Sequence, residues 1–178
     1  MRVLLSALML LGLSACGRQG SPAIDAAASE PAPLLGEYRA ASEDARLITG
    51  DMAIERGGLV FSKGAVLYTR ILNPRRGDDL VAQEGDTYAA IALGPSDLAI
   101  ELRRVIDQSL SAGARGFCGD DQPTYVALAH DARGADVTLL VFSGSEPPGP
   151  QATSSSFCGA FVYAAPDGAR TRQGVLLE

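Results

Sequence analysis

The chain has 178 residues, with 15 Lys and Arg against 21 Asp and Glu and a formal net charge of −6 at pH 7. This acidic balance lacks the basic surface on which nucleic-acid binding depends, so nucleic acid is excluded as a partner. No basic patch stands out for an anionic membrane surface either, and the length suits one domain of ordinary size.

The first sixteen residues have the pattern of an export signal. Arg2 supplies the only charge before Cys16, and residues 3–13 are apolar or small. This run is too short to cross a bilayer, which takes about 20 apolar residues, and is typical of a secretory signal peptide. Residues 13–16, Leu-Ser-Ala-Cys, resemble the lipobox of bacterial lipoproteins.

The resemblance implies that a peptidase removes residues 1–15 and that Cys16 becomes a lipidated first residue. Its thiol would carry a diacylglyceryl group and its amino group a fatty acyl chain such as palmitate. Gly17 stands where Asp would favour the inner membrane. We therefore expect lipid anchoring in the bacterial cell envelope, at the outer membrane and facing the periplasm. An ordinary signal peptide with Cys16 as a free thiol is the alternative, and a buried apolar helix is another.

A flexible tether is predicted between the anchor and the folded domain. Residues 17–33 are rich in Ala, Ser, Pro and Gly, and Ile24 is their only large apolar residue. Such a segment behaves as a flexible coil, with a mean reach of roughly 20–25 Å for this length. We expect residues 16–33 to form the lipidated tether and residues 34–178 a single globular domain.

Residues 51–72 predict a three-stranded meander. Apolar and polar residues alternate along them, with turn signals at Gly57-Gly58 and Lys63-Gly64. Residues 73–86 form a polar loop with Pro and Gly, and Thr87–Leu93 is predicted to be the next strand.

Residues 97–110 fit two structures. Leu102, Val105, Ile106 and Leu110 share one face of a helix with Leu98. The alternation of Leu98, Ile100 and Leu102 fits a strand equally. We favour the helix.

Three strands are predicted in the C-terminal half, at Thr124–His130, Val137–Phe142 and Phe157–Ala164, and Val175–Leu177 could add an edge strand. Short strands with frequent turn signals indicate a mainly β (α+β) domain: an antiparallel sheet forming a sandwich or partial barrel, with at most one helix near 97–110. The stretch LLGEY at 34–38 is similar, at its Gly and aromatic positions, to the opening of small lipocalin-like barrels.

The cysteine count favours one disulfide. Lipid on Cys16 would leave Cys118 and Cys158, each within a Phe-Cys-Gly triplet, as a pair in an oxidising compartment. A reactive thiol or metal pair would need a base or further ligands, and the chain has a single histidine. We predict a structural disulfide between Cys118 and Cys158.

No catalytic, metal or cofactor site is predicted. A Ser–His–acid triad would have to use His130, and no Gly-x-Ser-x-Gly or phosphate-loop motif is present. The acidic pairs Asp78-Asp79 and Asp120-Asp121 lack the spacing of a calcium loop and suit solvated turns. Asp97, Glu101 and Asp107 suit the solvent face of the expected helix.

The sequence therefore favours a membrane-anchored envelope lipoprotein whose small β domain is a non-enzymatic binding or structural module. Its partner would be an envelope protein, a glycan or a small apolar ligand. The alternatives are a lipocalin-like carrier of small apolar molecules and a hydrolase without a recognisable motif.

Overall fold

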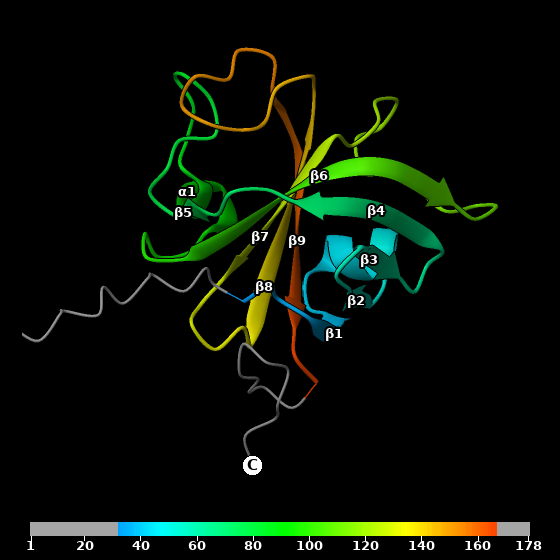
Figure 1. Cartoon of the computed structure of the whole chain (residues 1–178). Coiled ribbons are helices and arrows are strands. Elements are labelled where there is room, and N and C mark those ends of the chain that lie inside the picture. Colours follow the sequence, from blue (N-terminus) through cyan, green and yellow to red (C-terminus); the bar gives the residue numbers. More distant parts are fainter. Residues whose placement is uncertain (1–31, 167–178) are drawn as a thin grey trace, which may run out of the picture. The chain divides into compact units, whose positions relative to one another are not determined.

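A computed structural model describes residues 32–166 of the chain; the lipobox, residues 17–31 of the tether and the edge strand expected at Val175–Leu177 lie outside this range. The described residues form an antiparallel β-barrel with two short helices (Figure 1). The elements are β1 (Gly36–Ala40), η1 (Ala45–Thr49, a π-helical turn), β2 (Met52–Ile54), β3 (Gly58–Phe61), β4 (Ala65–Ile71), β5 (Arg75–Arg76), α1 (Tyr88–Ala92), β6 (Ala99–Leu110), β7 (Tyr125–His130), β8 (Asp136–Ser143) and β9 (Ser156–Ala164).

Eight of the nine strands close the barrel. The sheet order is β4-β3-β2-β1-β9-β8-β7-β6-β5, and β4 also pairs with β6 over its full length. β5 is the additional strand and pairs with the first residues of β6. The prediction of a mainly β, antiparallel fold is confirmed, and the barrel is closed rather than partial.

The predicted meander is present as β2, β3 and β4. Glu55 N–H donates to the carbonyl of Gly58 at the first turn, with an N···O distance of 2.9 Å. A Cβ at Gly58 would lie 2.5 Å from the carbonyl oxygen of Leu67, so glycine allows the two strands to approach here. The strands predicted at Thr124–His130, Val137–Phe142 and Phe157–Ala164 correspond to β7, β8 and β9.

Two local predictions are wrong. The helix favoured over 97–110 is the twelve-residue strand β6, and the strand expected at Thr87–Leu93 contains the helix α1. The Thr87 side chain caps α1 by accepting a hydrogen bond from Ala90 N–H at 3.1 Å, and Leu93 ends it in a left-handed conformation. A capped single turn is too short to be recognised from an apolar repeat.

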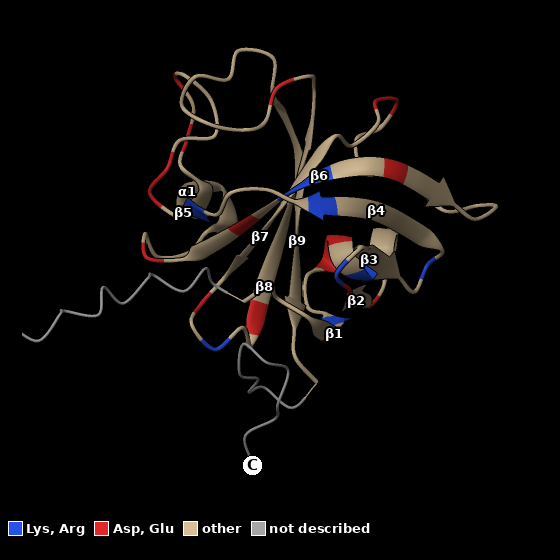
Figure 2. Cartoon of the chain, in the orientation of Figure 1, with Lys and Arg blue, Asp and Glu red and all other residues tan. Residues whose placement is uncertain are grey.

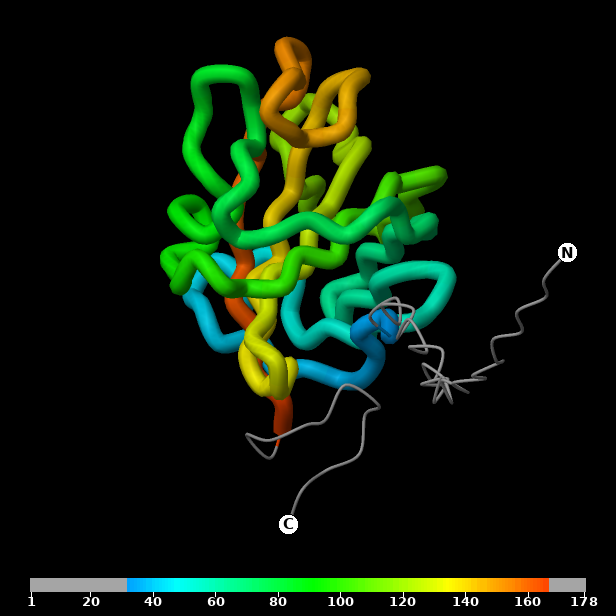
Figure 3. Tube along the Cα trace, turned by 60° about the vertical axis from the view of Figure 1, so that its left-hand side comes forward, coloured from blue at the N-terminus to red at the C-terminus, as the bar shows by residue number. Residues whose placement is uncertain are grey.

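The part of the sheet formed by β6, β7 and β8 is buried on both its inner and its outer face. Its interior is one apolar core, while a second core lies outside β6, β7 and β8, beneath an outer layer formed by residues 73–98 and 144–155. The two segments of the outer layer lie side by side in Figures 1 and 3, joined by backbone hydrogen bonds from Gly149 to Val81 and from Gln83 to Ala152. Every residue of β7 is buried as a result.

Large side chains occupy the interior. Phe117, from the loop between β6 and β7, packs against Phe61 and Phe161 with ring centroids 5.0 and 5.9 Å apart. Tyr163, also in this core, shares a 2.6 Å hydrogen bond with the hydroxyl of Thr49 on η1. Eight-stranded barrels are just wide enough for side chains to fill them or for one small ligand, and aromatic rings take up this interior.

Candidate functional site

The candidate site lies where β6 separates from β7. β6 pairs with β7 from Ala99 to Arg104 but continues along β4 to Leu110. The last backbone hydrogen bond along this edge of β6 runs from Val105 N–H to the carbonyl of Thr124, the residue before β7, at 2.8 Å. Beyond it, within residues 32–166, one edge of β6 is paired to β4 and no strand pairs with the other.

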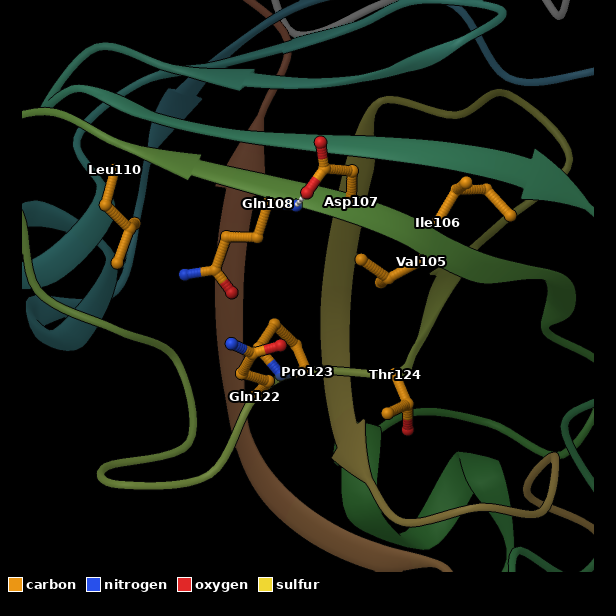
Figure 4. Close-up of a pocket in the computed structure, with 8 residues that line it drawn as sticks. All are labelled: Val105, Ile106, Asp107, Gln108, Leu110, Gln122, Pro123 and Thr124. Carbon is orange, nitrogen blue, oxygen red and sulfur yellow. Dashed lines mark hydrogen bonds between the residues drawn. The ribbon is translucent and has the colours of Figure 1, made fainter.

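A groove of about 440 Å³ occupies this separation (Figure 4). We call it the β6 groove. One wall is the second half of β6, from which Val105, Ile106, Gln108 and Leu110 contribute, and the other is formed by Gln122 and Pro123. Its volume falls in the range of about 300–1,000 Å³ that is usual for ligand pockets.

The β6 groove combines exposed apolar side chains with one unsatisfied polar group. Ile106 is 62% exposed and Leu110 42%. The side-chain oxygen Oε1 of Gln108 is buried and accepts no hydrogen bond from any described residue. A buried carbonyl without a donor costs free energy, so the Gln108 side chain destabilises the folded domain.

The second wall is held in place covalently. Cys118 and Cys158 form a disulfide, with their Cα atoms 4.9 Å apart, which ties the loop after β6 to β9. The neighbouring Phe117 is 5% exposed and anchors the same loop in the interior core. The loop that carries Gln122 and Pro123 is therefore anchored at its middle by Phe117 and Cys118. This anchoring restrains the second wall of the groove in the free protein.

Acidic residues lie on the second half of β6 and on the loop between β6 and β7 (Figure 2). Asp107 is the one charged residue among those that line it, and Asp120 and Asp121, both exposed, immediately precede Gln122. Arg115 is the single basic residue of the loop between β6 and β7. The electrostatic balance favours a ligand of positive charge.

A buried ion pair lies at the opposite end of β6. Arg103 is fully buried, and its Nε donates to Glu101 Oε1 at 2.7 Å. Glu101 Oε2 accepts the N–H of Leu34 at 2.8 Å, while Arg103 donates to the carbonyl of Leu34 at 3.4 Å and to that of Glu55 at 2.8 Å. The pair thus hydrogen-bonds both the N–H and the carbonyl of Leu34, two residues after the described chain begins.

These contacts overturn the prediction that Glu101 lies on a solvent-exposed face. Its side chain is 12% exposed and faces the barrel interior together with Arg103. Asp107, by contrast, is exposed as expected. The first half of β6 is apolar on its outward face, where the outer layer covers Ile100 and Leu102, and carries Glu101 and Arg103 on its inward face. This is the reverse of the usual pattern, in which polar residues of a strand face solvent, and it concealed the strand in the sequence.

Among the described residues, the ring of His130 has one hydrogen-bond partner, a backbone oxygen rather than a serine or a carboxylate. Its Nδ1 lies 2.7 Å from the backbone oxygen of Asp131, and the residue is 7% exposed. His130 pairs with Val137 on β8, whereas Ser143 ends that strand six residues further on, about 20 Å away at ordinary strand rise. Among the described residues no group of three His, Cys, Asp or Glu could hold a metal ion.

Shifted pKa values mark structural rather than reactive groups. Burial raises the pKa of Tyr88, in the outer layer, to about 12, and burial likewise raises the pKa of Tyr163 in the interior. Backbone N–H groups of Thr153 and Ser154 lower the pKa of Glu146 by donating to its carboxylate. None of these residues lines the β6 groove.

Comparison of the chain with protein-family models, with curated proteins and with solved structures finds no match in any of the three. Between residues 32 and 166 no helix has the length and apolar character needed to cross a membrane. No sequence motif marks Gln108, Leu110 or Pro123, because their place in the groove depends on the unequal lengths of β6 and β7.

Proposed function

We propose that this chain is a lipid-anchored protein of the bacterial envelope and that its barrel binds a protein partner at the β6 groove. The observation that carries the binding role is the unpaired edge of β6, which borders a groove in which Ile106 and Leu110 are exposed. The anchoring role rests on the lipobox resemblance of residues 13–16. The diacylglyceryl group and the fatty acyl chain on Cys16 would together provide more than the two anchoring signals that stable membrane attachment usually needs.

The fold favours surface binding over carriage of a small apolar molecule. An eight-stranded antiparallel barrel is also the architecture of lipocalin carriers. Here, however, Phe61, Phe117 and Phe161 pack against one another in the interior, where a carried ligand would have to sit. A ligand in the centre would displace those rings, whereas the β6 groove requires no displacement.

Leu34 and the β6 groove lie near opposite ends of β6. Leu34 is held by Glu101, seven residues before Gln108 on β6, which corresponds to about 23 Å along a strand. A partner bound in the groove would therefore leave the contacts of Leu34 intact.

Photo-crosslinking in the bacterium tests the binding role. The full-length protein would carry p-benzoylphenylalanine at Ile106, in the groove, or at Leu93, which is 94% exposed in the outer layer. We expect a discrete protein adduct from position 106 that disappears when Leu110→Asp is added, and no such adduct from position 93. Equal adducts from both positions, or none from position 106, would overturn the binding role.

The anchor is tested separately by Cys16→Ser. This variant should lose labelling by a fatty-acid analogue and should no longer be processed. Labelling that persists in the variant, or wild-type protein that is found soluble and without lipid, would overturn the anchor.

A further inference from the structure

We propose that the β6 groove takes an extended, positively charged segment of the partner, which adds as a strand to the free edge of β6. This proposal rests on the proposed binding function and specifies the ligand's chemistry. Strand addition obtains affinity from main-chain hydrogen bonds and specificity from alternate side chains.

The backbone geometry of β6 supplies the edge. Ser111 N–H donates to the carbonyl of Gly64 at 2.8 Å, so Ser111 faces the side of β6 on which β4 lies. Because hydrogen-bonding direction alternates along a strand, Leu110 and Gln108 direct their backbone groups to the opposite side. That side borders the groove, and within the described chain no strand pairs with it.

The edge is capped in part by a side chain. Asp107 Oδ1 accepts the backbone N–H of Gln108 at 2.8 Å (Figure 4). This local bond protects one donor until a ligand arrives, as natural sheets protect their exposed edges with charged groups. Within residues 32–166 no side chain caps the Leu110 backbone in this way, so Leu110 offers the first donor and acceptor for an added strand.

The opposite wall limits the ligand to a single strand paired on one side. Pro123 has no N–H and cannot complete a ladder from that wall. An extended segment that lies between this wall and β6 would direct alternate N–H and C=O groups towards β6, and the groups between them would point towards Gln122 and Pro123.

The acidic residues at and beside the groove, which form its rim, indicate the charge of the bound segment. Asp107 lines the groove, and the exposed Asp120 and Asp121 immediately precede Gln122 of its second wall, whereas Arg115 is the single basic residue of that loop. A Lys or Arg side chain beside an apolar residue would satisfy both the acidic rim and the exposed Ile106 and Leu110. The expected ligand is thus a short basic and apolar stretch of a protein.

The test uses the lipidated full-length protein in nanodiscs and a phage-displayed library of random nine-residue peptides as the probe. We expect selected peptides to be enriched in basic and apolar residues and to bind as synthetic peptides. N-methylation of alternate peptide residues should weaken binding about tenfold or more, while methylation of the intervening residues should change it little.

Two protein variants make the test specific. Leu110→Asp, which places a charge among the apolar side chains of the groove, should weaken peptide binding about tenfold, and Leu93→Ala in the outer layer should leave it unchanged. Asp107→Asn should weaken a Lys-containing peptide more than the same peptide with norleucine at that position.

The outcomes separate this proposal from the function on which it rests. Selected peptides that bind with no alternation in their N-methyl sensitivity, or whose binding Leu110→Asp does not weaken, would overturn strand addition. A specific photo-crosslink at Ile106 without any selected peptide would also overturn it, while leaving the binding function supported. Loss of both the crosslink and the peptides would overturn both.

Discussion

Removal of the Cys118–Cys158 disulfide should destabilise the barrel strongly. The two cysteines are 40 residues apart in sequence, and the ring that they close contains β7, β8 and the second segment of the outer layer. In the chain-entropy description, a loop of this length restricts the unfolded chain by about 4 kcal/mol at 25 °C. That is a large fraction of the 5–15 kcal/mol by which domains are usually stable.

The measurement is urea unfolding of wild-type protein and of the Cys118→Ala/Cys158→Ala variant. Tyrosine fluorescence and circular dichroism serve as signals because the chain has no tryptophan. We expect a loss of about 4 kcal/mol and a steeper dependence on urea, since the unfolded variant exposes more surface than a cross-linked chain.

Reductant provides the control. It should lower the stability of wild-type protein towards that of the variant and leave the variant unchanged. Should the wild-type protein lose less than about 1 kcal/mol under conditions in which both thiols become alkylated, the proposed role of the disulfide in restraining the loop after β6 would be refuted.

Three further predictions concern the interior, the groove and the outer layer. Arg103→Met should cost about 3–5 kcal/mol in urea unfolding because it leaves Glu101 buried without its partner, whereas Glu101→Leu/Arg103→Met should cost much less; equal losses would contradict the role of the pair. Gln108→Leu should stabilise the free protein by about 1 kcal/mol, since it removes an unsatisfied buried acceptor. A destabilised variant would show that the Gln108 side chain has a hydrogen-bond partner in the free protein. Because burial raises the pKa of Tyr88 to about 12 from 10.0, the unfolded state loses this proton first and stability should fall from pH 10 to pH 12, by about 1.4 kcal/mol per pH unit for this group. Tyr88→Phe should make the fall shallower in unfolding experiments at several pH values, and an unchanged slope would contradict the assignment.

The parts of the fold that local sequence determines were predictable. The meander of β2, β3 and β4 follows from alternation and from the glycines at 57 and 58, although the turn residues are Arg56 and Gly57, one position earlier than predicted. The C-terminal strands follow in the same way, because apolar β-branched and aromatic residues are dense there and Pro and Gly separate them. Closure into a barrel depends on the pairing of β1 with β9, which joins residues more than a hundred positions apart and leaves no local signal.

The errors have a common physical origin in the outer layer. Since it covers Ile100 and Leu102 from outside, β6 carries apolar residues on its outward face and the Glu101–Arg103 pair on its inward face. The usual assignment of polar residues to solvent fails for such a strand, and a helical face fits its apolar residues equally well.

The candidate site could not be predicted because it depends on the relative lengths of two strands. β6 has twelve residues and β7 has six, so the second half of β6 lacks a partner on one edge. Gln108 and Pro123 have no motif around them, and their roles follow from the place where the pairing ends. The pairing of Cys118 with Cys158, in contrast, was suggested by counting once Cys16 was assigned to lipid.

NMR of the lipidated protein in nanodiscs with a library-selected peptide tests the central claim, that ligands bind at the free edge of β6, most directly. The quantities are the hydrogen-exchange rate of the Leu110 amide and the intermolecular nuclear Overhauser effects of Gln108 and Leu110. We predict slower exchange at Leu110 and contacts between the peptide backbone and both residues. Unchanged exchange at Leu110, with peptide contacts instead at Phe161 in the interior or at Tyr88 in the outer layer, would contradict it.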